Sequence, residues 1–493
     1  MGQDVAPAVF SEEDAVAFRT QVAAGTQALG RMLDEGAFTS GRSLTGMEVE
    51  FHLVDPSGAP APRNAAVLAA IDDPDFTPEL AQFNIELNVP PRLLDGHQAV
   101  GLEAELAAQL DRAQTRARDL DSGLVMIGIL PTLRAGDLTA RALSANARYT
   151  LLDQQALAAR GTPLEIVIDG PQPLRLEVDT LTPEAACTSV QFHLQVDPDR
   201  FASRWNAAQA IAAAQVALGA NSPFFAGHRL WEETRIALFT QATETRPAHL
   251  RARHSGMRPR VWFGERWARG PLQLFEENLH FFPPLLPVHD DEDPLAVLDA
   301  GGVPALSPLR LHNGTVWRWN RPVYAVGEDG PHLRVENRVL PAGPTLVDIL
   351  ANGAFFYGAV HALGTAPDPV WDRLSFHAAE ANFLAASRLG LQARVTWPGM
   401  GAVSVQTLLL RRLIPLAHEG LRDWGVADEV RERLLGVVEA RTATGRTGSA
   451  WQRSTVESLE AGGLTADEAM VEMTRRYIAQ MHAGDPVHTW QVP

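Results

Sequence analysis

One eleven-residue stretch constrains the fold of this chain more than any other. Residues 45–55 alternate strictly, with apolar side chains on one side and Glu48, Glu50 and His52 on the other. A period of two is typical of a β-strand with one buried face. At a rise of roughly 3.3 Å per residue the two carboxylates lie about 7 Å apart, and at an effective dielectric constant of about 20 they repel each other by roughly 2 kcal/mol. A cation between them would remove this repulsion.

Three later stretches repeat the alternation: residues 82–89, 190–196 and 333–339, the last departing from it only at Asn337. If the four strands pair in one sheet, one face of that sheet is wholly apolar. The opposite face then collects Glu48, Glu50, Gln82, Asn84, Glu86, Gln191, His193, Arg334, Glu336 and Arg338. We predict that this polar face is the active site.

A plainer interpretation exists for each strand taken alone, because antiparallel sheets often have one solvated face. An ordinary solvated face, however, is rich in threonine, serine and lysine. The four strands instead carry acids, amides, a histidine and arginines. These residue types bind hard divalent cations and phosphate, so the set as a whole favours a binding site.

The basic residues exclude several chemistries. All 42 of them are arginine, and the sequence contains no lysine. A Walker A loop, a protein-kinase active site and a pyridoxal phosphate Schiff base all require lysine and are therefore excluded. With 59 acidic residues the net charge is -17, which argues against nucleic acid or an anionic membrane as a partner. Small polar substrates are expected instead.

Cys187 is the only cysteine, which excludes disulfide frameworks, thiolate zinc clusters and iron-sulfur centres. Residues 1–10 lack a basic region followed by an apolar run, and no window of about 18 uninterrupted apolar residues occurs in the chain. We therefore expect a cytoplasmic protein. With 493 residues, 46% of them hydrophobic, the chain is long enough for a large core.

Periodicity and turn residues predict the other elements. Helices are expected at residues 11–35, with a capping pattern at Ser11 and Asp14, and at 97–120, 151–160, 204–218, 231–239 and 345–363. Short strands are expected at 124–130 and 315–322, and a hairpin at 166–168 and 174–178. Residues 56–78 and 143–149 are predicted as loops, 246–308 as helices with long connections, and 370–493 as several helices.

Five motifs, in this order, resemble those of the glutamate-cysteine ligase type 2 family of ATP-dependent carboxylate-amine ligases. They are Gly46-x-Glu48-x-Glu50, Asn84-x-Glu86-Leu87, Gln191-Phe192-His193-Leu194, the segment Asn221-Ser222-Pro223 followed by Arg235, and Glu336-x-Arg338. The third is a mixed form, because the family usually has His-x-His-x or Gln-x-Asn-x there. The resemblance spans about residues 40–365.

The resemblance implies an α+β fold, in which a curved antiparallel sheet has a polar concave face and carries helices on its other face. Such a domain is similar to the catalytic domains of glutamine synthetase and the guanido kinases. Residues 1–365 would form this domain, and residues 366–493 a mainly helical C-terminal segment packed on it. Pro367, Asp368 and Pro369 mark the boundary.

The resemblance also implies ATP as a co-substrate and two or three Mg²⁺ ions. The expected metal ligands are Glu48, Glu50, Glu86 and Glu336, together with Gln191 or His193. Of Gln191 and His193, one would bind metal and the other would contact phosphate. The expected catalytic residues are Glu48, Glu50, Glu336 and Arg338.

These residues permit a two-step reaction, in which ATP converts a carboxylate into an acyl phosphate that an amine then attacks. Mg²⁺ would screen the acids from the triphosphate, and Arg338 would stabilise charge on the transferred phosphoryl group. The nucleotide is expected to contact Gln191, His193, Asn221, Arg235 and Arg338. The candidates for binding the α-carboxylate of glutamate are Arg148, Arg318 and Arg321, because arginine binds carboxylates in a bidentate manner.

The leading hypothesis is a ligase that joins glutamate to an amine, most simply cysteine. A ligase with another amine, a kinase that phosphorylates a small acceptor as phosphagen kinases do, and a nucleotide- or metal-binding protein without catalysis are the alternatives. The sequence contains no short signature that identifies the amine.

Overall fold

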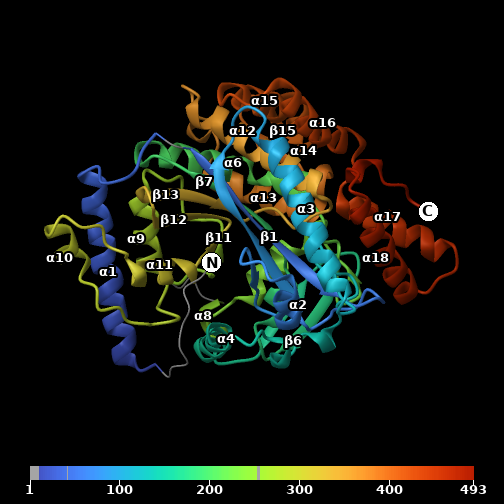
Figure 1. The fold of residues 1–493 in the computed structure, drawn as a ribbon, viewed down its shortest axis with the longest axis horizontal. Coiled ribbons are helices and arrows are strands. Elements are labelled where there is room, and N and C mark those ends of the chain that lie inside the picture. The colour runs from blue at the N-terminus through green and yellow to red at the C-terminus, as the bar shows by residue number, and fades with distance from the viewer. Residues whose placement is uncertain (1–9, 42, 252–255) are drawn as a thin grey trace.

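The computed structural model describes residues 10–41, 43–251 and 256–493. Nearly all of the N-terminal stretch considered above, and part of the segment 246–308, therefore lie outside the described residues. Within the described residues, seven strands form one curved sheet in the order β12-β13-β7-β1-β3-β2, with β4 also paired to β1 (Figure 1). Every pair in it is antiparallel. The strands are β1 (Leu44–Val54), β2 (Phe76–Pro78), β3 (Asn84–Leu93), β4 (Gly123–Val125), β7 (Val190–Gln195), β12 (Asn320–Gly327) and β13 (Gly330–Asn337).

Helices α12 (Leu346–Thr365) and α6 (Pro198–Gly219) contribute to the core on the apolar side of the sheet. The side chains of Val49 and Phe51 on β1 are buried there, as is Phe192 on β7. Phe192 packs against the rings of Phe356 and Tyr357 of α12, with ring centroids 6.1 and 5.7 Å apart. The helix approaches so closely that a Cβ on Gly353 would lie 2.9 Å from the Phe192 ring. Only glycine fits at that position without displacing the ring.

The apolar face is interrupted by Asn337 and by Asn320, which lies opposite it on β12, so the prediction of a wholly apolar face was wrong there. Asn337 is fully buried and exchanges hydrogen bonds with Gln215 of α6, and its amide nitrogen also donates to Asn320. Because each amide is satisfied by the others, the buried polar groups carry no unpaired-donor penalty.

The opposite, polar face of the sheet lies across a cavity from five helices. These are α4 (Ala147–Arg160), α5 (Thr182–Ala185), α7 (Thr234–Ala242), α9 (Pro271–Phe281) and α11 (Ser307–Gly314). The cavity thus has a sheet wall and a helical wall.

Most of the predicted elements are confirmed with shifts of a few residues. Helix α1 (Glu12–Asp34) begins with the expected capping box, in which Ser11 and Asp14 bond each other's backbone N–H. The predicted hairpin is β5 (Leu164–Ile168) with β6 (Leu174–Val178). The other confirmed helices are α3 (Gln98–Arg118), α6, α7 (Thr234–Ala242) and α12.

Several of the predicted boundaries were wrong. Helix α6 begins at Pro198, although it was predicted from residue 204, and the strand predicted at 315–322 is divided between β11 (Trp317–Arg318) and β12. Residues 56–78 contain α2 (Asn64–Ile71) and β2, although they were predicted as a loop. Helix α4 starts at Ala147, capped by the Asn146 side chain, and so includes part of the predicted loop. The apolar run predicted as a strand at 124–130 pairs with β1 only through Gly123–Val125.

The C-terminal segment is mainly helical and belongs to the same core as the sheet domain. Its helices α13 (Phe376–Leu389), α15 (Ile414–Asp423) and α16 (Asp428–Thr444), and then α17 (Gly448–Ala461) and α18 (Ala466–Ala483), occupy the orange and red part of Figure 1. It also contains a hairpin that was not predicted, β14 (Arg394–Trp397) with β15 (Gly401–Ser404). A domain boundary at residue 365 stays a prediction.

The remaining described elements are short. They are α8 (Ala248–Arg251), α10 (Pro294–Asp299), α14 (Val405–Leu408), β8 (Phe224–Phe225), β9 (His228–Arg229), β10 (Val261–Trp262) and β11 (Trp317–Arg318). Among the described helices, α12 is the one long and apolar enough to cross a membrane, and 83% of its most apolar window is buried inside the protein. A helix buried in this way is typical of a protein core.

Candidate active site

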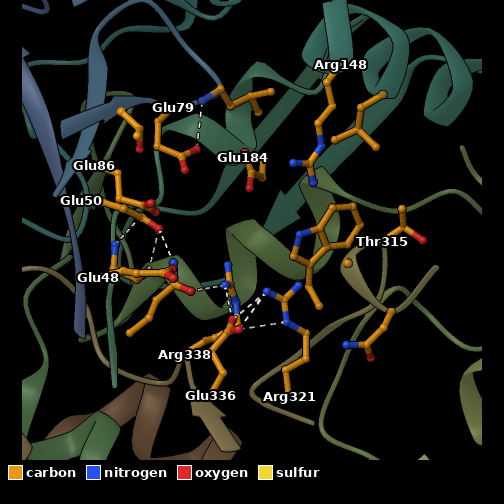
Figure 2. A pocket seen from close by; sticks show the side chains of 18 of the residues that line it. Glu48, Glu50, Glu79, Glu86, Arg148, Glu184, Thr315, Arg321, Glu336 and Arg338 are labelled. Carbon is orange, nitrogen blue, oxygen red and sulfur yellow. Dashed lines mark hydrogen bonds and ion pairs between the residues drawn. The ribbon is translucent and has the colours of Figure 1, made fainter. Parts of the chain in front are cut away.

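The pairing of the strands brings the predicted acids together. Glu50 of β1 lies opposite Glu86 of β3, and Glu48 lies opposite Gln191 of β7. On the next strand Glu336 of β13 lies opposite His193. Because side chains alternate along each strand, these residues share the polar face, and Figure 2 shows the labelled acids turned toward one cavity. Acids from three distant strands therefore converge on one wall.

The cavity has a volume of about 550 Å³, which is within the usual range for a small-molecule site. Its sheet wall carries Glu48, Glu50, Glu86, Gln191, Glu336 and Arg338. Its helical wall carries Arg148 and Tyr149 of α4, Glu184 of α5, Phe275 of α9 and Arg310 of α11. The polar sheet wall thus faces a helical wall that carries both charged and apolar side chains.

Glu50, Glu86 and Glu79 form a compact group of acids, with one oxygen of each lying within 4.8 Å of the others. Burial raises the pKa of Glu50 to about 7, with Glu79 adding to the effect, and raises the pKa of Glu86 well above its ordinary value, helped by Glu48 and Glu79. Burial raises the pKa of Glu79 as well. The shifts show that this group has too little positive charge around it, and three convergent carboxylates fit a hard divalent cation such as Mg²⁺.

Glu336 is different, because the protein itself neutralises it. Its carboxylate accepts hydrogen bonds from Arg321 Nη2 (2.9 Å) and Arg338 Nη1 (2.7 Å). Burial alone would raise the pKa of Glu336, but the charges of Arg321 and Arg338 outweigh burial and hold it well below the ordinary value. Glu336 therefore stays ionised and orients both guanidinium groups.

Glu48 is paired with a histidine. His193 Nε2 lies 3.1 Å from Glu48 Oε1, while Arg334 Nε donates to His193 Nδ1 at 3.1 Å. Burial would raise the pKa of Glu48, but the charge and hydrogen bonding of His193 outweigh it and lower the pKa to about 2. The contact of Arg334 with Nδ1 leaves Nε2 as the ring nitrogen that faces Glu48.

Gln191 connects Glu50 with Arg338 on the sheet wall. Its side-chain N–H donates to Glu50 Oε1 at 2.8 Å, and its side-chain oxygen accepts a short hydrogen bond from Arg338. Glu50 also accepts hydrogen bonds from the backbone N–H and the hydroxyl group of Ser189, at 2.6 and 3.0 Å. The Glu50 carboxylate and the Arg338 guanidinium are thus fixed relative to each other.

Arg235 lies at the cavity, where it supports Arg338. Its guanidinium donates to the backbone oxygen of Val339 and pairs with Glu233 at 3.2 Å. It also stacks on Trp319, with its central carbon 5.6 Å from the ring centroid. These contacts fix the chain next to Arg338.

Three of the residues predicted for the site do not line the cavity. His193 is one of them, and it acts through its contact with Glu48. The other two are Arg318 and Asn221. Arg318 is fully buried, pairs with Glu277 at 3.1 Å and stacks on Trp262. Arg318 and Arg321 are three residues apart in an extended segment. Because side chains alternate along such a segment, the two point to opposite sides. Asn221 is also fully buried, and its side-chain N–H groups donate to Ala342 O and to the Tyr477 hydroxyl group. Both residues stabilise the surroundings of the site.

Two acids of the cavity were missed by the sequence analysis. Glu79 lies in the connection between β2 and β3, and Glu184 lies on the four-residue helix α5. Neither sits in an alternating stretch, so periodicity gave no signal for them. Six residues lie between Glu79 and Glu86, and only the turn that they form brings the two carboxylates together.

The sequence and the structure were compared with known proteins. The family model described as "Glutamate-cysteine ligase family 2(GCS2)" matches residues 44–476, which is most of the chain. No curated protein sequence matches.

Two solved structures are similar in fold. A glutamate-cysteine ligase from Francisella tularensis in complex with AMP has 13% identity and a TM-score of 0.50, with 93% of this chain and 91% of that chain covered. A bifunctional glutathione synthetase from Pasteurella multocida has 11% identity and a TM-score of 0.54, with 94% of this chain and 55% of that chain covered. This chain thus spans about half the length of the bifunctional protein. The predicted fold class is confirmed, and family and neighbours indicate an ATP-dependent ligase. The chain belongs to glutamate-cysteine ligase family 2.

Proposed function

We propose that the protein is an ATP- and Mg²⁺-dependent ligase that joins the γ-carboxylate of glutamate to an amine, most simply cysteine, through an acyl phosphate. The observation that carries this proposal is the convergence of Glu48, Glu50, Glu86 and Glu336 with Arg338 on one wall of one cavity. Acids alone would repel both substrates, since a carboxylate and a triphosphate are anionic. The same acids loaded with Mg²⁺ attract them.

The metal ligands proposed here differ from the sequence prediction in two ways: Glu79 is added, and neither Gln191 nor His193 is kept as a ligand. Glu50, Glu79 and Glu86 would hold one Mg²⁺ ion, and Glu48 and Glu336 would contribute to one or two further ions. When bound, Mg²⁺ neutralises phosphate charge and assists departure of the nucleotide. His193 is assigned to positioning Glu48, because its Nδ1 accepts from Arg334. Gln191 is assigned to holding Glu50 and Arg338.

Arg338 is the residue proposed to contact the transferred phosphoryl group. Its guanidinium is held by Glu336 and Gln191, so its geometry is set before the nucleotide arrives. A preorganised donor stabilises developing charge more effectively than one that must reorient. Arg235 helps to hold Arg338 in place, because it donates to the backbone oxygen of the next residue, Val339.

Arg148 is the proposed partner of the α-carboxylate of glutamate. It lines the cavity from the helical wall, its Nε is buried without a hydrogen-bond partner, and among the described residues its guanidinium has no ion pair. Arg321 is already paired with Glu336. Of the three arginines first considered, Arg148 is therefore the one with its charge available to a substrate.

Release of ADP and phosphate tests this function. Purified protein is incubated with Mg-ATP, L-glutamate and each standard amino acid in turn, and the products are identified by mass. A γ-glutamyl amide formed with stoichiometric ADP and phosphate supports the proposal, and the amine that gives it identifies the second substrate. A stable phosphorylated product instead would indicate a kinase. Binding of Mg-ATP without turnover would indicate a non-catalytic relative.

A further inference from the structure

Glu184 stands apart from the other acids of the cavity. It projects from α5 on the helical wall, facing the sheet wall (Figure 2). Among the described residues its carboxylate has no hydrogen bond or ion pair. Glu48, Glu50 and Glu336 on the sheet wall are all held by neighbouring side chains. The carboxylate of Glu184 is therefore available to a ligand in the cavity.

The surroundings of Glu184 place it beside the reacting groups. Burial raises its pKa to about 8, with the charges of Glu79 and Glu50 adding to the effect and that of Arg338 opposing it. The carboxylate lines the same cavity as the proposed metal ligands and the proposed phosphoryl-binding arginine. It is not a member of the compact acid group, which consists of Glu50, Glu79 and Glu86. A cationic group of a substrate would relieve its unfavourable burial.

The second half of the proposed reaction requires a carboxylate of this kind. An amino acid carries its amine as an ammonium group at neutral pH, and an ammonium group has no lone pair with which to attack. It must be bound beside the acyl phosphate and lose a proton there. The arginines of the cavity would repel it. The acids of the sheet wall are held by neighbouring side chains or, with Glu79, are assigned to Mg²⁺. Glu184 is the remaining acid at the cavity.

We propose that Glu184 binds the ammonium group of the amine substrate and accepts one of its protons. This inference rests on the proposed ligase function. The Glu184 carboxylate takes the proton, and the lone pair left on nitrogen forms the C–N bond with the acyl carbon. The bond from that carbon to the phosphate oxygen then breaks with its electron pair, and phosphate leaves. The second proton of the nitrogen goes to the departing phosphate.

Hydroxylamine provides a direct test, because it is uncharged at neutral pH and attacks acyl phosphates without first losing a proton. Glu184→Gln is compared with wild-type protein in two assays that share L-glutamate and Mg-ATP. One assay contains an equimolar mixture of the twenty standard amino acids as amines, and the other contains hydroxylamine. Glu177→Gln, an exposed glutamate of β6, is the matched control.

Glu184→Gln should lower kcat/KM for the amino acid amines by about 10²-fold or more, the usual contribution of a general base, while retaining most hydroxamate formation. Retained hydroxamate formation also shows that the variant is folded and still activates glutamate. Glu184→Asp, which keeps a carboxylate, should recover part of the amine activity, and the control should equal wild type.

An equal loss in the two assays, or an unchanged rate with the amino acids, would overturn the role of Glu184. So would a wild-type protein that forms the hydroxamate but accepts none of the amino acids as an amine, since no ammonium substrate would then need a base. Failure of the wild-type protein in both assays is a different result. It would overturn the proposed ligase function itself, and the inference with it.

Discussion

At the scale of single residues, the acids around the cavity differ in how far the protein neutralises them. Glu336 has two arginine partners and a pKa held well below its ordinary value despite burial. Glu50 and Glu86 lie against each other and Glu79, and burial raises the pKa of both. The protein therefore fixes Arg338 with its own acids and leaves a second group of acids for a ligand cation.

Replacing Arg338 with lysine should reduce ATP turnover by about 10²-fold or more, the usual loss when a preorganised donor is removed. Nη1 of Arg338 donates to both Gln191 and Glu336. Lysine keeps the positive charge, but its ammonium group lacks the further guanidinium donors that would bond a phosphoryl oxygen at the same time. The measurement is steady-state ADP release at saturating Mg-ATP. Arg175→Lys, at an exposed position on β6, is the control. An unchanged rate for Arg338→Lys would remove this residue from the mechanism.

The sequence predicted those site residues that lie on alternating strands, since alternation alone assigns a face. It did not predict the positions of side chains that depend on contacts between separate segments. Arg318 was a reasonable candidate by type, yet Glu277 and Trp262 hold it in the interior. Glu79 was missed because a turn, and no periodic pattern, brings it to Glu86. Distances between separate segments cannot be obtained from one-dimensional spacing.

At the scale of elements, the strands could be predicted because a half-buried strand must alternate. The sheet order could not, since four alternating strands are compatible with many pairings. Residues 56–78 were predicted as a loop because proline and alanine are common in them, yet α2 forms there and packs against α3. Its eight residues are too few for periodicity to distinguish a helix from irregular structure.

Helix α11 supplies a test of how stability depends on pH. His312 is buried, its Nε2 donates to Asn278 O at 3.1 Å, and burial lowers its pKa to about 4. In the unfolded chain its pKa is about 6.5, so between these values only the unfolded state binds the proton. The contribution of neutral His312 is therefore complete above about pH 6.5 and is lost as the pH falls toward 4.

Over this window His312 should add about 1.4 kcal/mol per pH unit to the slope of unfolding free energy against pH. His312→Gln, which keeps an N–H donor without a titrating ring, should lower the slope by up to that amount. Urea unfolding between pH 4.5 and 6 provides the measurement. Equal slopes for the two proteins would show that His312 is protonated in the folded state.

At the scale of the whole molecule, the C-terminal segment is connected to the sheet domain by a buried ion pair. Arg441 of α16 bonds Asp348 at 2.7 Å and Asn352 at 2.6 Å, both on α12. Asp348 also accepts the backbone N–H of Val487, near the C-terminus, at 3.0 Å. Helix α12 thus packs against the apolar side of the active-site sheet and also binds helix α16 of the C-terminal segment.

Arg441→Met should lower the free energy of unfolding by about 3–5 kcal/mol, because it leaves Asp348 buried without its charge partner. Urea denaturation of this variant and of the double variant with Asp348→Asn provides the measurement. The double variant should lose less than the sum of the single losses, since neither charge is then left unpaired. Losses that simply add would show that the two residues stabilise the protein independently.

The most direct test of the central claim is calorimetric titration of the nucleotide-free protein with Mg²⁺, followed by thermal unfolding with and without Mg²⁺. Wild-type protein should bind Mg²⁺ and gain about 2.7 kcal/mol of stability at a concentration of 100 times Kd. Glu86→Gln should lose most of this binding, yet be at least as stable without Mg²⁺, because a neutral amide ends the repulsion from Glu48 and Glu79. If Glu86→Gln binds Mg²⁺ as tightly as wild type, the acids of the sheet do not form the metal site.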